Sequence, residues 1–208
     1  MTKHTIDYDT IIKLTNAISQ CQDPEKIALI TAESVTKAFD AKGCSVFLVN
    51  RKTREMGLVA SYGLSSDYLD KGKVRFMQTI KEAKDVVPIA IYDVLDDPRI
   101  QYPEEAKKEG ISSLLGVPII SHNVVIGALR VYTEKKWEFS LSDIAMVQAV
   151  AMICGMAMEM SWMLKDHEED LETCKMKDEE ENTFGLGRIQ NMNQLLRSIR
   201  GLKIENPK

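Results

Sequence analysis

The chain has 208 residues, of which 44% are hydrophobic and 28% charged, enough for one soluble domain with a sizeable core plus an extension. Its net charge of −4 gives no whole-chain reason to expect nucleic acid as a partner. The N-terminus, MTKHTIDYDT, lacks the apolar core of a signal peptide, so we expect a cytoplasmic location. The four cysteines show neither C-x-x-C nor zinc spacing, so in a cytoplasmic chain we expect reduced thiols and no metal site.

The first quarter of the chain predicts two helices and then a hairpin. Residues 7–39 carry apolar residues at helical spacing, and Asp23-Pro24 restarts the helix because Asp caps helix N-termini and Pro fits the first helical position. The runs CSVFLVN (44–50) and MGLVASYG (56–63) are rich in β-branched and aromatic residues. We expect two strands joined by the polar connection RKTRE.

The middle of the chain is less regular. Residues 65–84 are mixed, with a helical patch at VRFMQTIKEA, and VVPIAIYDV (86–94) predicts a short strand. Pro88 cannot donate to a strand ladder, so this strand should lie at an edge or carry a bulge. PEEAKKEG (103–110) predicts a short helix with Pro just inside its start and Gly just past its end.

Two further strands, 113–120 and 124–132, flank a connection short enough for a tight hairpin, in which Asn123 tolerates positive φ. Alternation along the second strand gives it two faces. One face is purely apolar and suits packing: Val125, Gly127, Leu129 and Val131. The other carries two polar-tipped side chains and suits the wall of a cavity: Ile126, Ala128, Arg130 and Tyr132.

A capping box opens the longest predicted helix. Ser140 is followed three residues later by Asp143, so the two residues can satisfy each other's backbone N–H groups. The helix can run to about residue 181, roughly 60 Å at 1.5 Å per residue. Its apolar stretch, 144–164, is interrupted by polar residues and followed by charge, so we expect a buried or interface helix and no membrane span.

One stripe continues through this helix at alternating spacings of four and three residues, the pattern of a coiled-coil seam. We expect it to form the interface of a homodimer. The stripe comprises Met146, Val150, Ile153, Ala157, Met160, Leu164, His167, Leu171 and Cys174.

Beyond this helix, FGLG (184–187) allows the chain to reverse. Residues 188–203 predict an amphipathic helix that packs back on the long helix. The alternative is a peptide that docks on a separate output protein and is disordered until bound. We therefore expect a domain at 1–162 and an extension at 163–208, composed of a coiled-coil signalling helix to about 181 and the tail helix.

The order of these features resembles the GAF domain over about residues 8–162. The most specific pieces are S-x-L-x-V-P-I from Ser113, V-I-G-A-L-R-V from Val125, and F-x-x-x-D from Phe139 to Asp143. The segment D-x-x-D-D-P-R at 93–99 also resembles the family's loop after its edge strand. Each motif alone is weak, and their order and spacing together carry the resemblance.

The resemblance implies an α+β, PAS-related fold with a central antiparallel sheet. The N- and C-terminal helices would cover one face of that sheet. Loops and short helices on the other face would enclose a small-molecule pocket. The resemblance also implies a sensory or regulatory module that is often dimeric and signals through its C-terminal helix to an output domain.

We expect any ligand on the sheet face that bears Arg130 and Tyr132, beneath segment 93–99. The candidate ligand contacts are Tyr62, Phe76, Asp93, Arg99, Leu115, Arg130 and Tyr132. Arg130 offers a guanidinium for an anion. Each of these roles has a structural alternative. Asp93 and Arg99 would instead cap turns and pair with each other, and Arg130 would instead reach a carboxylate at the sheet margin.

Several specialised members of the family fit poorly. The cyclic-nucleotide signature continues F-x-x-x-D with Glu, where this chain has Ile144, and no N-K partner is evident. Segment 61–116 contains no cysteine, which argues against free-methionine-sulfoxide reductase chemistry and against a bilin. None of the three histidines falls on the expected pocket face, which argues against haem.

These patterns predict a non-catalytic small-molecule sensor that signals through a dimeric helix, with an unidentified ligand and cofactor content unknown. The alternative is a ligand-free GAF-like scaffold that dimerises and binds partner proteins. No nucleophile with a base, acid–base pair or phosphate loop is apparent, so we expect no catalytic residue. Neither nucleic acid nor a membrane is expected as a partner.

Overall fold

The computed structural model describes residues 8–51, 53, 55–72 and 87–167. The chain forms two compact units, Met1–Trp162 and Met163–Lys208. The fold described below is that of the first unit. The predicted coiled coil beyond residue 167 and the predicted tail helix lie outside the described residues.

A five-stranded antiparallel sheet forms the centre of the unit, with the strand order β2-β1-β5-β4-β3. Its strands are β1 (Gly43–Val49), β2 (Met56–Tyr62), β3 (Ile89–Ile91), β4 (Ser113–Ser121) and β5 (Val124–Thr133). β3 lies at an edge, as Pro88 predicted, but it is only three residues long. The two hairpins, β1–β2 and β4–β5, occur where the sequence predicted them.

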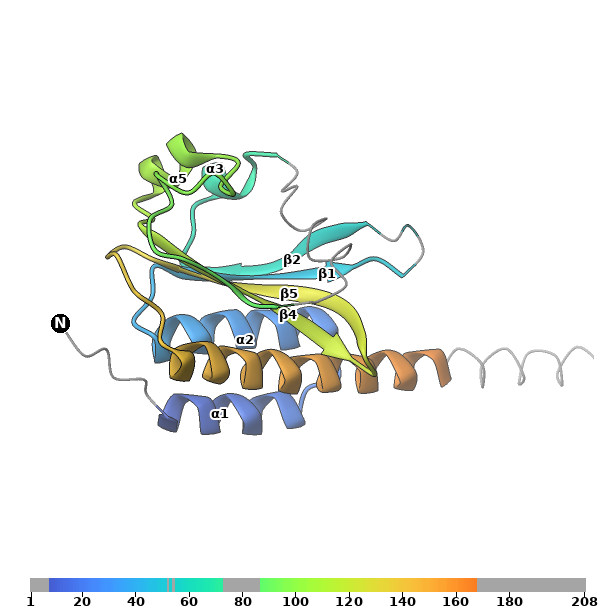
Figure 1. Cartoon of the computed structure of the whole chain (residues 1–208). Helices are drawn as coiled ribbons and strands as arrows, with labels where there is room; N and C mark the ends of the chain where they lie inside the picture. The colour runs from blue at the N-terminus through green and yellow to red at the C-terminus, as the bar shows by residue number, and fades with distance from the viewer. Residues whose placement is uncertain (1–7, 52, 54, 73–86, 168–208) are drawn as a thin grey trace, which may run out of the picture. The chain divides into compact units, whose positions relative to one another are not determined.

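Three helices lie on one side of the sheet (Figure 1). They are α1 (Tyr8–Ser19), α2 (Pro24–Ala38) and the helix Leu141–His167, which we call the exit helix. α2 and the exit helix lie next to the sheet, and α1 packs against α2 on the side away from the sheet. The Asp23 side chain accepts a hydrogen bond from the backbone N–H of Glu25, so α2 begins with the predicted cap. The main core lies between these helices and the alternate residues Val46, Val117 and Leu129 of the central strands.

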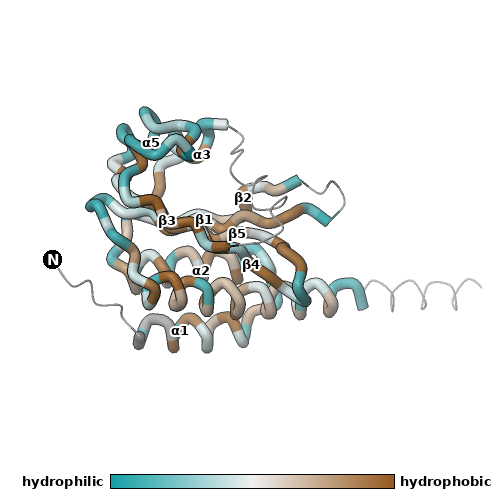
Figure 2. The backbone as a smooth tube through the Cα atoms, viewed as in Figure 1, coloured by the Kyte–Doolittle hydropathy of each residue, from teal (hydrophilic) through white to brown (hydrophobic). Residues whose placement is uncertain are grey.

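The opposite face carries two short helices and their loops, α3 (Ser66–Leu69) and α5 (Pro103–Glu109). They enclose a second apolar cluster: Tyr68, Ile91, Val94, Ala106, Ile111, Leu114 and Tyr132. Figure 2 shows the strands as largely hydrophobic and α5 as hydrophilic. β4 is therefore buried on both faces. This two-sided arrangement confirms the predicted α+β fold class and the placement of the terminal helices.

The β4–β5 hairpin turns through His122 and Asn123, with φ values of 46° and 64°. Both residues sit in the left-handed region that two-residue turns of this kind require. A bulge follows, because Ile119 pairs with Gly127 but Ile120 pairs with Val125, which leaves Ile126 without a partner in the register.

The bulge corrects the predicted faces at the start of β5. Val125 packs against the cluster of Phe47 and Ala128, on the face of the short helices. Ile126 packs against the main core instead. Strict alternation holds only from Gly127 onward, because one extra residue inverts the side-chain direction before it.

The exit helix is the one helix among the described residues that is long and apolar enough to cross a membrane by length and composition. Such a signal is weak, since a buried helix of a soluble domain gives it too. Its inner residues Val147, Val150 and Cys154 are fully buried in the main core. We assign the apolar character of this inner side to that packing.

The predicted dimer seam is only partly on the surface. Val150 is fully buried, and Met146, Ile153 and Ala157 pack against the main core. The structure therefore removes Val150 from the predicted interface, because the same four-and-three spacing also describes the side of a helix that faces a sheet. Met160, Leu164 and His167 are exposed. Leu171 lies outside the described residues.

Candidate functional site

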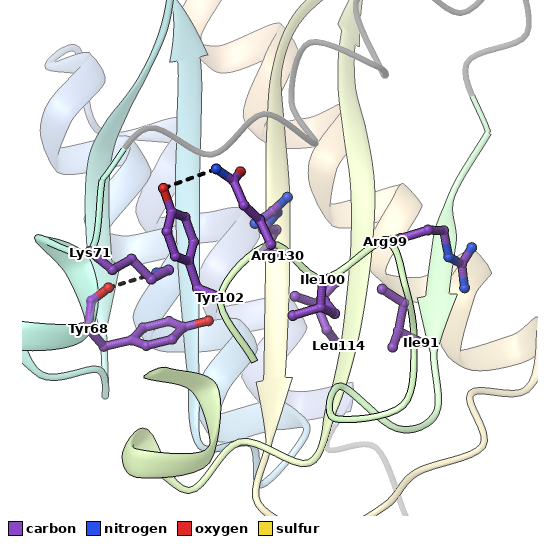
Figure 3. Close-up of a pocket in the computed structure, with 9 residues that line it drawn as sticks. Tyr68, Lys71, Ile91, Arg99, Ile100, Tyr102, Leu114 and Arg130 are labelled. Atoms are coloured by element: carbon purple, nitrogen blue, oxygen red, sulfur yellow. Dashed lines mark hydrogen bonds between the residues drawn. The ribbon is translucent and has the colours of Figure 1, made fainter. Parts of the chain in front are cut away.

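A cavity lies on the face of the short helices (Figure 3). Its volume is ≈ 30 Å³, which is space for about two water molecules. The lining side chains come from α3, β3, the loop before α5, β4 and β5. They are Tyr68, Lys71, Ile91, Arg99, Ile100, Gln101, Tyr102, Leu114 and Arg130.

The short helix α3 brings two of these residues to the cavity. The Ser65 hydroxyl accepts a hydrogen bond from the Tyr68 backbone N–H, which caps α3. Glu109 of α5 in turn accepts hydrogen bonds from the Ser65 backbone N–H (2.8 Å) and hydroxyl. α5 thus fixes the start of α3. Sequence reasoning missed Lys71 and Tyr68 because α3 is four residues long and has no apolar period.

Positively charged side chains line the cavity. Arg130 is only 5% exposed and its guanidinium lies 5.6 Å from the Phe47 ring. The Lys71 ammonium lies 3.2 Å from the centre of the Tyr68 ring and donates to the Tyr68 carbonyl at 2.7 Å. Burial, and next the positive charge of Arg130, lower the pKa of Lys71 to about 8.

Tyr132, an expected ligand contact, lies in the apolar cluster next to the cavity. It is 1% exposed, and its ring meets that of Tyr68 edge-on at 5.9 Å. Burial raises the pKa of its hydroxyl, while the charge of Arg130 and hydrogen bonds with Arg130 and Ser45 act in the opposite direction. Tyr132 therefore supports Arg130 from the same strand face and does not line the cavity.

Asp93 and Arg99 lie in the loop after β3, with partners other than those expected. Asp93 accepts a hydrogen bond from the Leu95 backbone N–H and forms an ion pair with Lys136, whose hydrogen bond lowers the pKa of Asp93. Arg99 lines the cavity, but its guanidinium binds Asp97 (Nε to Oδ1, 2.9 Å). In Figure 3 this guanidinium points away from Arg130.

Two other candidates lie on the helix-covered face. Leu115 is fully buried in the main core, and its neighbour Leu114 lines the cavity instead. Tyr62 pairs with Cys44 and its ring lies 6.0 Å from the Lys37 ammonium of α2. Both residues therefore leave the candidate site. Phe76 lies outside the described residues.

The cysteines within the described residues do not reach the cavity. Cys44 and Cys154 are buried in the main core, and burial raises the pKa of both thiols, that of Cys154 to about 11. Cys21 is partly buried and packs against the same core. Among the described residues, no cysteine lines the cavity. The cations Lys71 and Arg130 do line it, and cations of this kind suit the binding of an anion.

Comparison with protein families gives a match to the GAF domain over residues 23–158. Comparison with curated proteins gives no match. Among solved structures, the GAF domain of a phosphoenolpyruvate-protein phosphotransferase from Coxiella burnetii is similar, with a TM-score of 0.65 and 20% identity. That alignment covers 76% of this chain and 96% of the other.

Two further solved structures share the fold. One is a domain of a putative two-component sensor histidine kinase from Sinorhizobium meliloti, with a TM-score of 0.56, 20% identity, and coverage of 69% of this chain and 96% of that one. The other is a free methionine-R-sulfoxide reductase from Neisseria meningitidis in complex with its substrate. It has a TM-score of 0.61, 18% identity, and coverage of 74% and 89%.

Proposed function

The chain belongs to the GAF domain family, and on that premise we propose that it binds a small molecule in the cavity between Lys71 and Arg130 and signals through the exit helix. GAF domains are typically sensory or regulatory parts of signalling proteins. In this proposal the domain is cytoplasmic and non-catalytic, and the exit helix of one chain packs against that of a second copy.

The buried charge of Arg130 is the observation that carries the binding proposal. Two cations that share one cavity repel each other, and this repulsion contributes to the lowered pKa of Lys71. Here Arg130 stands on the central strand β5, and its guanidinium shares the cavity with a second cation, Lys71. A bound ligand with matching polarity would stabilise this arrangement.

The exit helix supports the dimer part of the proposal. Its outer face is apolar and carries no charge from residue 145 to residue 156. The exposed residues of this outer face are Ala145, Ala149, Met152, Met156 and Met160, with Met152, Met156 and Met160 between 58% and 65% exposed. Their spacing of three or four residues suits a second helix of the same kind. A second copy would present the same surface, so the contact is self-complementary.

Two sets of contacts relate the sheet, which carries Arg130, to the exit helix. Arg130 alternates along β5 with Leu129 and Val131, which pack in the core beneath the helices. The β1–β2 connection reaches the exit helix directly, because the Arg51 guanidinium lies 4.4 Å from the Trp162 ring and 3.3 Å from a Glu159 carboxylate oxygen. A shift of the sheet on ligand binding would therefore move the side of the exit helix that it contacts.

The alternative of a ligand-free scaffold has one observation in its favour. The cavity of ≈ 30 Å³ is far smaller than the several hundred Å³ of ordinary ligand pockets. A scaffold would dimerise through the same exit helix but would have no ligand to lose. The two functions therefore differ in whether the stability of the protein depends on a bound molecule.

Freshly purified protein is expected to melt about 5 °C or more above protein that has been unfolded in guanidinium chloride, desalted and refolded, since a ligand held above its Kd stabilises the native state. In the Arg130→Met variant the two preparations should melt together. Lys42→Met, a surface lysine paired with Glu134, should retain the difference. Equal melting temperatures for fresh and refolded wild-type protein, with identical circular dichroism spectra, would favour the scaffold.

A further inference from the structure

We propose that the cavity holds the oxyanion group of the ligand, a carboxylate or a phosphate, between Lys71 and Arg130. This inference rests on the proposed function and adds the chemical class of the ligand. The class follows from the charge, the hydrogen-bond donors and the volume of the cavity.

The charge of the lining is one-sided. The nine described residues that line the cavity include three cations and no Asp or Glu. One cation, Arg99, is bound by Asp97 and directed away. The other two, Lys71 and Arg130, are close enough for the charge of Arg130 to lower the pKa of Lys71 through their mutual repulsion. An anion between them would offset that repulsion, whereas a neutral ligand would not.

The acidic groups near Lys71 do not substitute for such an anion. Glu105 and Glu109, both on α5, raise the pKa of Lys71, but burial and Arg130 outweigh them. Glu109 already accepts hydrogen bonds from Ser65, which hold it at the start of α3. With a pKa of about 8, Lys71 is mostly protonated at neutral pH and loses its proton a little above it.

The donors also suit an oxyanion. An Arg guanidinium presents a fork of N–H groups that matches two oxygens of a carboxylate or phosphate, and a Lys ammonium adds a point charge. The Tyr102 hydroxyl lies on the same side of the cavity and is held by the Gln101 amide, at 3.0 Å. Gly72, with φ of 113°, permits this approach, since a Cβ there would lie 2.9 Å from the Tyr102 hydroxyl oxygen.

The volume limits what the lining can enclose. Space for about two water molecules admits one carboxylate or phosphate group and excludes an entire nucleotide. The cavity would thus recognise the charged end of a molecule. Among small probes, acetate and inorganic phosphate represent that end group, and acetamide matches acetate in shape without its charge.

Titration of isotope-labelled, refolded protein with these probes, followed by NMR, tests the proposal. Acetate or phosphate should shift the backbone amide signals of Lys71, Leu114 and Arg130 in a saturable manner at millimolar concentrations, and acetamide should not. The tighter of the two anions indicates which oxyanion the ligand carries. Arg130→Met should weaken binding at least about tenfold, the effect of losing one hydrogen bond to a charged group.

The pH dependence gives a second readout. Acetate is ionised throughout, so its affinity should fall about tenfold from about pH 7 to about pH 9.5, as Lys71 loses its proton with a pKa of about 8. Lys71→Met should bind more weakly at neutral pH and lose this dependence. Because Lys71 is only partly buried, this variant should fold even if Arg130→Met does not. Lys42→Met should behave as the wild type.

Either of two results overturns the inference. One is acetamide binding as well as acetate, and the other is no saturable shift at these amides with either anion up to tens of millimolar. If the melting difference between fresh and refolded protein persists in such a case, the cavity holds a neutral ligand and only the oxyanion assignment fails. If that difference is absent too, the proposed function fails with it.

Discussion

Replacing Asp143 with Ala is expected to lower the free energy of unfolding by about 2–4 kcal/mol, because one carboxylate organises the whole start of the exit helix. Asp143 is 8% exposed and accepts hydrogen bonds from the Trp137 indole N–H (3.2 Å) and the Ser140 backbone N–H (2.8 Å). The Asp143 backbone N–H donates to the Ser140 hydroxyl, which completes the predicted capping box. The Trp137 ring stacks on Phe139 at 5.4 Å, so the same carboxylate also fixes the aromatic segment that precedes the helix.

Chemical denaturation followed by circular dichroism measures this loss. Glu138→Ala is the matched control, because it removes a carboxylate from the same segment at a residue that is exposed. Its effect should stay within about 0.5 kcal/mol. A loss below about 1 kcal/mol for Asp143→Ala would show that the cap contributes little and that the helix start is held by the aromatic packing alone.

Charged substitutions on the outer face of the exit helix are expected to abolish the proposed dimer. The double variant Met156→Glu/Met160→Glu introduces two negative charges on the outer face of each exit helix. In the proposed dimer these charges would be buried close to the same charges of the second copy. Burying carboxylates without partners costs several kcal/mol, so the dimer Kd should rise at least about a hundredfold. The folded monomer should tolerate both changes, because Met156 and Met160 are 61% and 65% exposed.

Sedimentation velocity measures the oligomeric state of this pair of variants. The matched control is Leu95→Glu, which introduces the same charge at a leucine that is 50% exposed in the loop after β3. This control should sediment like the wild type. Wild-type protein that is monomeric at high micromolar concentration would contradict the dimer.

The local rules of turns and caps predicted much of the fold. Asp23 caps α2, Gly110 ends α5 in the left-handed conformation with φ of 78°, and Asn123 turns the β4–β5 hairpin. Each of these features depends on a few neighbouring residues whose conformational preferences are strong. The order of such features was sufficient for the resemblance to the GAF domain, which the family comparison confirms.

The faces of the sheet were harder to predict than its strands. β4 is buried on both sides, so hydrophobicity alone does not distinguish Leu115, which faces the helices, from Leu114, which lines the cavity. The bulge at Ile126 inverted the start of β5, and a bulge has no fixed sequence signature. The error at Leu115 therefore came from the choice of strand face, and the bulge changed the faces only of Val125 and Ile126.

The site was predicted only in part because its residues come from distant segments. Arg130 was identified because a charged residue interrupts an apolar strand. Lys71 was missed because it follows a one-turn helix whose position depends on Glu109, which lies far along the chain in α5. Asp93 and Arg99 were candidate ligand contacts, with turn capping and a mutual ion pair as the alternative. Asp93 does cap a turn, but the ion-pair partners are Lys136 for Asp93 and Asp97 for Arg99. The partner of Asp93 is a tertiary contact that no local pattern encodes.

Native mass spectrometry of freshly purified protein tests the central claim most directly, because one spectrum reports both the oligomer and any bound molecule. The account predicts a species at twice the chain mass of 23.5 kDa plus a small molecule on each chain. The Arg130→Met variant should keep the dimer mass and lose the added mass. A wild-type spectrum of bare chains, which differs from that of Arg130→Met only by the mass of the substitution, would contradict the assignment of a small-molecule sensor.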